Sequence, residues 1–495
     1  MTTLALTDTS PESANADAVV IGLYTGGALA PGAEGLDAAL DGRLAETLRL
    51  LGARGEALEV TKLATLGATT APVVVAVGLG DPATVTPETL RRAAGAAVRA
   101  LAGTARVALA LPTDGTATLR AVGEGALLGA YDFTAYKSSL DGRPKPVSAV
   151  TLVTGDAADK AAKAEVKRAT AVAAAVHRSR DWINTPPNDL RPPAFAEAAA
   201  AAATKAGLEV EVLDERALAR GGYGGILAVG MGSEAPPRLV RIAWSPRGAR
   251  RHVALVGKGI TFDTGGISIK PAAGMHEMKS DMSGAASVVA TMLAIAALKP
   301  KVRVTAYVPM AENMPSGSAY RPGDVVTMYG GKRVEVLNTD AEGRMVLGDA
   351  LARAVEDEPD YVFETSTLTG GQVVALGSRV SGVMGTPEVT ERVKAAGERT
   401  GEAMWPMPLP EEVRSGMDSA IADLSQVDAG GNRAGHMLQG GTFLSEFVGD
   451  VPWAHIDIAG PSYNGGQPWG HVTRGGTGVP VRTLLELVET IAAEG

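Results

Sequence analysis

The stretch Asn338-Thr339-Asp340-Ala341-Glu342-Gly343-Arg344 lies between a short apolar run and a segment with helical spacing. Its two carboxylates are two residues apart, and a glycine and an arginine follow them directly. An acidic first turn of a helix has the same composition, because Asp and Glu are stabilised there by the helix dipole. A metal site at a strand-to-helix corner is the other interpretation, and these seven residues alone do not separate the two.

The composition limits both the core and the chemistry of this chain of 495 residues. Hydrophobic residues make up 45% but aromatic residues only 4%, so the core must be built from closely packed Ala, Val, Leu and Gly. The length allows two or three domains. A net charge of −9 argues against binding of a nucleic-acid backbone. With no cysteine, the chain has no disulfides, thiolate metal ligands or Cys nucleophiles.

No targeting or membrane segment is recognisable in the sequence. Residues 1–18 lack a basic region followed by an apolar region, and no window approaches eighteen uninterrupted apolar residues. We therefore expect a soluble, cytoplasmic protein with no membrane partner.

The first part of the chain alternates β-branched runs with Ala- and Leu-rich segments. We expect strands at 18–23, 72–77, 106–111 and 148–153, and helices at 36–51, 87–101 and 116–131. This alternation predicts a small, mostly parallel sheet with helices on its faces. No phosphate-loop or dinucleotide-binding motif occurs here, so we predict no chemistry in this part.

A long helical segment connects the two parts. It runs from about residue 157 to 183 and meets Pro186-Pro187, which cannot continue a helix. We accordingly place the first domain at residues 1–165, a linker helix and turn at 166–190, and the second domain at 191–495.

In the second domain a strand followed by a polar, Gly-rich loop recurs three times. The expected strands are 252–256, 334–337 and 361–364. Ligands of open α/β sheets bind beyond the carboxyl ends of the strands, so we expect one sheet with one active edge. Further along, we expect a loop at 430–441 and a helix at 442–448.

These loops carry the titratable groups Lys258, Asp263, Lys270, Asp281, Asp340, Glu342 and Arg344. Four carboxylates brought together raise each other's pKa unless positive charge intervenes, and two divalent ions would balance them. For Lys258 the alternative is a salt bridge to Asp263, because lysine is an unusual metal ligand. Neither H-E-x-x-H nor G-x-S-x-G occurs, which removes two common hydrolase signatures.

The blocks 256–266, 268–271, 278–284 and 338–344 resemble the leucine aminopeptidase family of cytosolic dinuclear zinc peptidases. The similarity extends to 184–189 and 365–371, whereas the first half matches only weakly, at 124–129 and 136–138. Met345 stands where Leu is usual, a core-type exchange. The resemblance implies a two-domain α/β fold. A small, macro-like N-terminal domain would serve assembly or regulation, and a larger C-terminal metallopeptidase domain would have a mixed central sheet.

Residue by residue, the resemblance implies that Asp263 and Glu342 bridge two metal ions. Asp340 would hold the more exchangeable ion, and a neutral Lys258 with Asp281 would complete the tighter one. The catalytic residues would be Lys270, which stabilises the oxyanion, and Arg344, which binds a bicarbonate that moves the proton. The pocket for the first side chain would be lined by Met278, Thr367, Leu368 and Gly370. From the sequence alone, Met278 could equally be a core residue.

We therefore expect a metallo-aminopeptidase that removes the N-terminal residue, Leu or another mostly apolar one, from intracellular peptides. Its nucleophile would be a water activated by two zinc or manganese ions. The resemblance also implies a homo-hexamer. A two-metal phosphoesterase and a DNA-binding regulatory protein are the alternatives, and the acidic net charge counts against the second.

Overall fold

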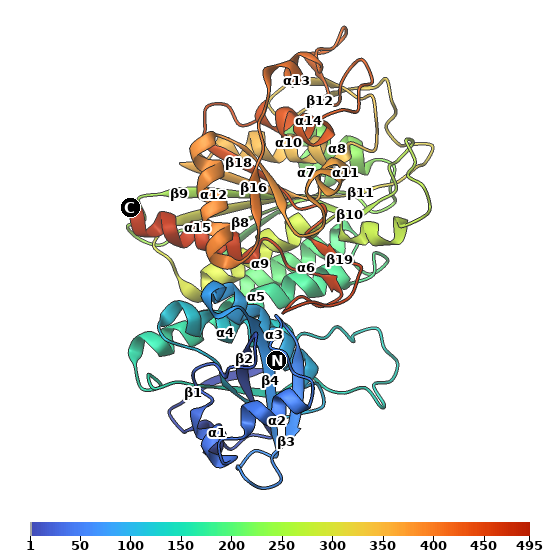
Figure 1. The fold of residues 1–495 in the computed structure, drawn as a ribbon. Helices are drawn as coiled ribbons and strands as arrows, with labels where there is room; N and C mark the ends of the chain where they lie inside the picture. The colour runs from blue at the N-terminus through green and yellow to red at the C-terminus, as the bar shows by residue number, and fades with distance from the viewer. Residues whose placement is uncertain (1) are drawn as a thin grey trace. The chain divides into compact units, whose positions relative to one another are not determined.

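The computed structural model describes residues 2–495, which divide into two compact units (Figure 1). The first unit contains the chain up to His177 together with residues 465–474, and the second contains 178–464 and 475–495. The division falls inside the helix α5 (Lys160–Asn184), so the predicted long helix that connects the two parts is present.

A six-stranded sheet forms the first unit. Its strands are β1 (Thr3–Thr7), β2 (Ala18–Tyr24), β3 (Val60–Ala64), β4 (Val73–Gly80), β5 (Arg106–Ala110) and β6 (Ala149–Val153). The order is β1-β6-β5-β2-β4-β3, and only the β3–β4 pair is antiparallel. The sheet is mostly parallel, as predicted. The edge strands β1 and β3 were not predicted, because they are partly exposed and carry no continuous apolar run.

The helical elements of this unit are η1 (Pro11–Ser13), α1 (Glu34–Ala39), α2 (Leu44–Leu50), η2 (Pro82–Thr84), α3 (Pro87–Ala100) and α4 (Thr116–Gly129). The single helix expected at 36–51 is wrong: the chain turns between α1 and α2, where Asp41 and Gly42 have φ of 55° and 71°. The expected α3 begins at Pro87, where Thr86 and Thr89 form a reciprocal capping box.

A nine-stranded mixed sheet lies at the centre of the second unit. Its strands are β7 (Glu209–Leu213), β8 (Arg238–Trp244), β9 (His252–Gly257), β10 (Gly259–Asp263), β11 (Arg303–Asn313), β14 (Tyr361–Ser366), β15 (Ser381–Gly385), β16 (Met404–Pro406) and β18 (Trp453–Asp457). The neighbouring strands β18-β14-β9-β11 are parallel. Strand β8 runs antiparallel to β11 and β7, and β15 runs antiparallel to β18 but parallel to β16. The predicted two-domain α/β fold with a mixed central sheet is confirmed.

Two smaller sheets accompany it: β12 (Val325–Thr327) with β13 (Arg333–Glu335) and β17 (Leu424–Ser425), and β19 (Tyr463–Asn464) with β20 (Gly475–Gly476). The strand expected at 334–337 is therefore not part of the central sheet, and the prediction that all three loops leave one sheet is wrong. Only Val334 is buried within β13. A strand of the central sheet would be buried on both faces.

The helical elements of the second unit are α6 (Pro192–Lys205), α7 (Glu215–Gly221), α8 (Gly224–Gly230), η3 (Met275–Ser280), α9 (Ser283–Leu298), α10 (Glu342–Val355), α11 (Gly370–Leu376), α12 (Pro387–Thr400), α13 (Glu411–Ser415), α14 (His436–Ser445) and α15 (Val481–Glu494). The loop expected at 430–441 is interrupted, because α14 begins at His436. Gly440 and Gly441 lie inside this helix, and these positions are glycine because a Cβ at either would meet a neighbouring side chain at 2.9 Å or less.

Glycines bring α9 against the sheet. A Cβ on Gly257, at the end of β9, would lie 2.6 Å from the carbonyl oxygen of Gly284. A Cβ on Gly284 would lie 2.2 Å from the carbonyl oxygen of Thr365. Only glycine allows backbones to approach this closely. The first turn of α9 therefore rests directly on the carboxyl ends of β9 and β14.

One segment, Met275–Leu298, is long and apolar enough to cross a membrane by length and composition alone. It contains η3 and α9. In this structure 83% of its apolar window is buried, as in the core helix of a folded domain.

Asp349 of α10 provides a test of the packing of α10 against α8. It is fully buried and accepts hydrogen bonds from the backbone N–H groups of Ile226 and Tyr329, both at 2.8 Å. Asp349→Ala should lower the free energy of unfolding by about 2–4 kcal/mol, because the buried N–H of Ile226 and the partly buried N–H of Tyr329 lose their acceptor. Denaturant unfolding measures the change. The control Asp418→Ala, at an exposed ion pair with Arg414, should cost at most about 1 kcal/mol. Equal losses in the two variants would contradict this account.

Candidate metal centre

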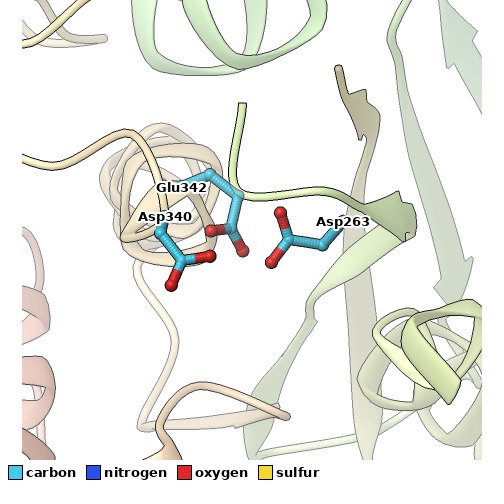
Figure 2. A group of neighbouring side chains, drawn as sticks. All are labelled: Asp263, Asp340 and Glu342. Carbon is cyan, nitrogen blue, oxygen red and sulfur yellow. The ribbon is translucent and has the colours of Figure 1, made fainter. Parts of the chain in front are cut away.

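Three carboxylates from two separate segments converge in the second unit. Asp263 is the last residue of β10, Asp340 lies in the turn before α10, and Glu342 is the first residue of α10. Each offers an oxygen atom, and these atoms all lie within 4.8 Å of one another. Figure 2 shows the three carboxylates turned toward a common space. Such a group is what a metal-binding site requires.

Lys258 joins a fourth carboxylate to this group. Its Nζ lies 2.9 Å from Asp281 and 2.8 Å from Glu342, and it donates to the carbonyl oxygen of Thr367 at 3.1 Å. Lys258, Asp281 and Glu342 are all buried. The salt bridge that the sequence suggested for Lys258, to Asp263, is replaced by these two ion pairs.

Lys270 neutralises the opposite side of the cluster. Its Nζ lies 2.7 Å from Asp263 and also pairs with Asp340. Four carboxylates against two lysines leave two surplus negative charges in a mostly buried space. Burial and the neighbouring Glu342 raise the pKa of Asp263 to about 6. Burial opposes the charged form of Lys258, but Asp281 and Glu342 outweigh it and raise the pKa of this lysine.

The donor atoms fit a divalent cation. Glu342 Oε2 is buried and has no hydrogen-bond partner among residues 2–495. A buried carboxylate oxygen without a partner is costly, and a cation bound beside it would remove that cost. Carboxylate oxygens suit Mg²⁺, Mn²⁺ or Zn²⁺, so the ligand set does not select one metal.

Arg344 lies in the first turn of α10, two residues after Glu342, and is 1% exposed. Its Nη1 donates to the carbonyl oxygen of Gln426 at 2.6 Å, whereas its Nε has no hydrogen-bond partner in the described part of the chain. Burial lowers the pKa of Arg344 to about 10, so the guanidinium is charged near neutral pH. A free, buried N–H of a cation is suited to a small anion.

Three of the residues expected to line the substrate pocket, Thr367, Leu368 and Gly370, lie in the β14–α11 loop or at the start of α11. Thr367 Oγ1 donates to Asp281 Oδ1 at 2.7 Å, and Leu368 packs so closely on α14 that a Cβ on Gly440 would lie 2.9 Å from it. Gly370 is exposed at the start of α11. Met278 is half-buried in η3, and its carbonyl oxygen accepts from the Asp281 N–H at 3.2 Å.

Sequence reasoning missed two supports of the cluster. Asn313 donates to Asp263 Oδ1 at 2.8 Å and to the Thr339 carbonyl at 3.0 Å. Gln426 accepts from the backbone N–H groups of Leu337 and Asn338 and donates to the Ala341 carbonyl. Asn313 could have been found, because it ends a buried strand just as Asp263 does. Gln426 carries no signal, since it acts across more than eighty residues of sequence.

Surplus buried carboxylates beside a mixed α/β sheet, with lysines and an arginine close by, are typical of metal-dependent enzymes, among them the hydrolases. Comparison with known proteins narrows this class. Models of the cytosol aminopeptidase family match the chain twice, the N-terminal domain at residues 20–140 and the catalytic domain at 177–485. The chain belongs to the cytosol aminopeptidase family, so it is a peptidase, and the predicted resemblance is confirmed.

Individual relatives agree with this assignment. A probable cytosol aminopeptidase of Streptomyces coelicolor is 52% identical, and the alignment covers 100% of this chain and 99% of the relative. A probable cytosol aminopeptidase of Rhodococcus jostii is also 52% identical, and the alignment covers 97% of this chain and 95% of that relative. Among solved structures, the bottromycin maturation enzyme BotP in complex with Mn has a TM-score of 0.85 at 37% identity, covering 96% and 100%. A mutant of tomato leucine aminopeptidase has a TM-score of 0.87 at 29% identity, covering 99% and 97%.

Gly343 tests the position of Lys258. A Cβ there would lie 2.5 Å from Lys258 Cε and 2.7 Å from its Nζ, so Gly343→Ala should displace the flexible lysine without unfolding α10. We expect a melting temperature close to that of the parent protein, and binding of Mn²⁺ weakened by about 10-fold or more in calorimetric titration. In the control Gly348→Ala, on the same helix, the new Cβ meets Met328 Cε at 2.9 Å and the Phe447 ring at 3.2 Å instead of Lys258, and Mn²⁺ binding should be unchanged. Parent-like binding by Gly343→Ala would contradict the assigned place of Lys258.

Proposed function

We propose that this chain is an aminopeptidase that uses two divalent ions, zinc or manganese, to remove Leu and other mostly apolar residues from the N-termini of peptides. The observation that carries the proposal is the convergence of Asp263, Asp340 and Glu342 within 4.8 Å, beside a fourth carboxylate and two lysines. The Mn in the BotP complex supports a divalent metal in this family.

The ligands would divide between two ions. Asp263 and Glu342 would be shared, Asp340 would hold one ion, and Lys258 with Asp281 would hold the other. As a ligand, Lys258 would have to be neutral. Its amine can lose the proton only when a dication, rather than a carboxylate, becomes its direct partner. Bound there, the ions would acidify a water and polarise the scissile carbonyl.

The chain's own cations would act on the reacting peptide. Lys270 is the more exposed of the two lysines, with 22% of its side chain exposed against 3% for Lys258. It can therefore stabilise negative charge on the carbonyl oxygen of the peptide. Arg344 would hold a bicarbonate at its unpartnered Nε, since the planar guanidinium matches a planar anion. That anion would accept and return the proton that the arginine itself cannot release.

The pocket for the first side chain would be formed by Met278, Thr367, Leu368 and Gly370. Leu368 and Met278 would supply an apolar surface, and Gly370 leaves room beside them because it has no side chain. This composition favours apolar first residues. The free amine of the peptide would dock on the tighter ion, the one held by Lys258 and Asp281.

The wider setting follows from the same proposal. We place the protein in the cytoplasm, as a homo-hexamer active in peptide turnover, with the first unit serving assembly or regulation. The linker would be residues 166–190, between domains 1–165 and 191–495. A two-metal phosphoesterase is less well supported, because a phosphate substrate needs neither a neutral lysine ligand nor an arginine-bound anion.

Removal of metal tests the proposed function. Hydrolysis of a leucine anilide should fall to background after exhaustive chelation and should return on addition of Mn²⁺ or Zn²⁺, because the carboxylates alone cannot activate water. Activity is followed by release of the aniline, with metal content measured in parallel. A phosphate ester serves as the negative-control substrate. Full activity in a sample shown to be metal-free would refute the proposal.

The role of Arg344 is tested with bicarbonate. In carbon-dioxide-free buffer, added bicarbonate should raise the kcat of the parent protein, whereas sodium chloride of equal ionic strength should not. Arg344→Ala should lower kcat by about 10²-fold and lose the bicarbonate response, because a preorganised charged donor is removed. If Arg344→Ala responds to bicarbonate as the parent does, the anion binds elsewhere.

A further inference from the structure

Four polar side chains form a square on one face of β14 and β18. In the parallel register Glu364 lies opposite His455, and Ser366 lies opposite Asp457. Residues two apart on a strand share a face, so all four side chains point the same way. All four residues are 0% exposed. Polar side chains are rarely buried in such a group unless they make specific contacts, so we ask what these four side chains bind.

Asp457 restrains the loop that follows β14. Its Oδ1 accepts from the Leu368 N–H at 3.1 Å, and its Oδ2 accepts from Thr369 Oγ1 at 2.7 Å. Thr369 in turn caps α11 by accepting from the Gln372 N–H. One buried carboxylate therefore holds two successive residues of the loop and the start of the helix after it.

The residue just before them contacts the candidate metal ligands. Thr367 Oγ1 donates to Asp281 Oδ1 at 2.7 Å, and the Thr367 carbonyl oxygen accepts from Lys258 Nζ at 3.1 Å. A single peptide bond joins Thr367 to Leu368. The loop thus connects Asp457 on one side with Asp281 and Lys258 on the other.

The imidazole of His455 lies beside Asp457 in the square. His455 Nδ1 donates to Glu364 Oε2, and His455 Nε2 lies 3.9 Å from Asp457 Oδ2. Burial opposes protonation of His455, but Glu364 and Asp457 outweigh it and raise its pKa. Among the described residues Asp457 has no lysine or arginine at ion-pair distance. His455 is therefore the nearest group that can balance its charge.

We propose that Asp457 is a positioning residue: by fixing Leu368 and Thr369 it holds Thr367 where Thr367 orients Asp281 and Lys258 for the tighter metal ion. This inference rests on the proposed function and adds a support that is not itself a ligand. Groups that orient metal ligands typically change metal affinity by about 10- to 100-fold when they are removed.

The test is calorimetric titration of chelator-treated, full-length protein with Mn²⁺ alone. Asp457→Asn keeps the shape of the side chain but removes its charge and one acceptor, and it should weaken the tighter Mn²⁺ site by about 10-fold. In leucine anilide hydrolysis, kcat should fall more than KM rises. Thr369→Val removes one hydrogen bond to Asp457 together with the cap of α11 but leaves the Leu368 N–H bond to Asp457 in place, and it should shift both quantities in the same direction by less. It keeps the test available if Asp457→Asn does not fold.

Asp349→Asn is the matched control. Asp349 is equally buried and accepts from two backbone N–H groups, as Asp457 does from Leu368 and Ala459, but its donors lie outside the β14–α11 loop. Its substitution should lower the melting temperature while the folded protein binds Mn²⁺ as the parent does. The inference is overturned if Asp457→Asn binds Mn²⁺ with the affinity of the parent protein, or if Asp349→Asn loses as much Mn²⁺ affinity as Asp457→Asn does. A parent protein that binds no Mn²⁺ would instead refute the proposed function.

Discussion

Four carboxylates share a mostly buried space in which, among residues 2–495, two lysines form ion pairs with them, and the second unit is organised around this electrostatic constraint. Carboxylates placed this close repel one another and resist burial. Part of the cost is offset by helix dipoles, because Glu342 opens α10 and Asp281 lies two residues before α9. The remainder is a surplus of negative charge, which a bound cation would remove.

The backbone around the cluster is shaped to tolerate that surplus. Gly257 and Gly284 let α9 rest directly on the ends of two strands, and Gly343 leaves the space that Lys258 occupies. Asn313 and Gln426 hold the backbone of the turn before α10. A site that opposes folding in this way must be enforced by its surroundings, and binding of an ion to the folded state would stabilise the whole unit.

The segments of the cluster are connected through backbone as well as side chains. The central sheet delivers Lys258 and Asp263, whereas the small sheet of β12, β13 and β17 delivers Asp340 and Glu342. The β14–α11 loop lies beside Asp281 and is held from behind by Asp457. Rigid supports of this kind matter because metal sites and substrate pockets depend on positions accurate to a fraction of an ångström.

The sequence by itself determined the family, the α/β class and the charged residues of the cluster, because these depend on local motifs and on continuous apolar runs. It also placed the inner strands β2, β4, β5 and β6 of the first sheet, β9 and β14 of the central sheet, and the long connecting helix. It did not place the edge strands β1 and β3 or the break between α1 and α2, where the pattern is weak. Only the tertiary structure decided that Lys258 pairs with Asp281 and Glu342, that residues 338–344 follow a separate small sheet, and that Asn313, Gln426 and Asp457 support the site. These contacts join residues far apart in sequence, and their partners are set by strand register and packing, which no local pattern encodes.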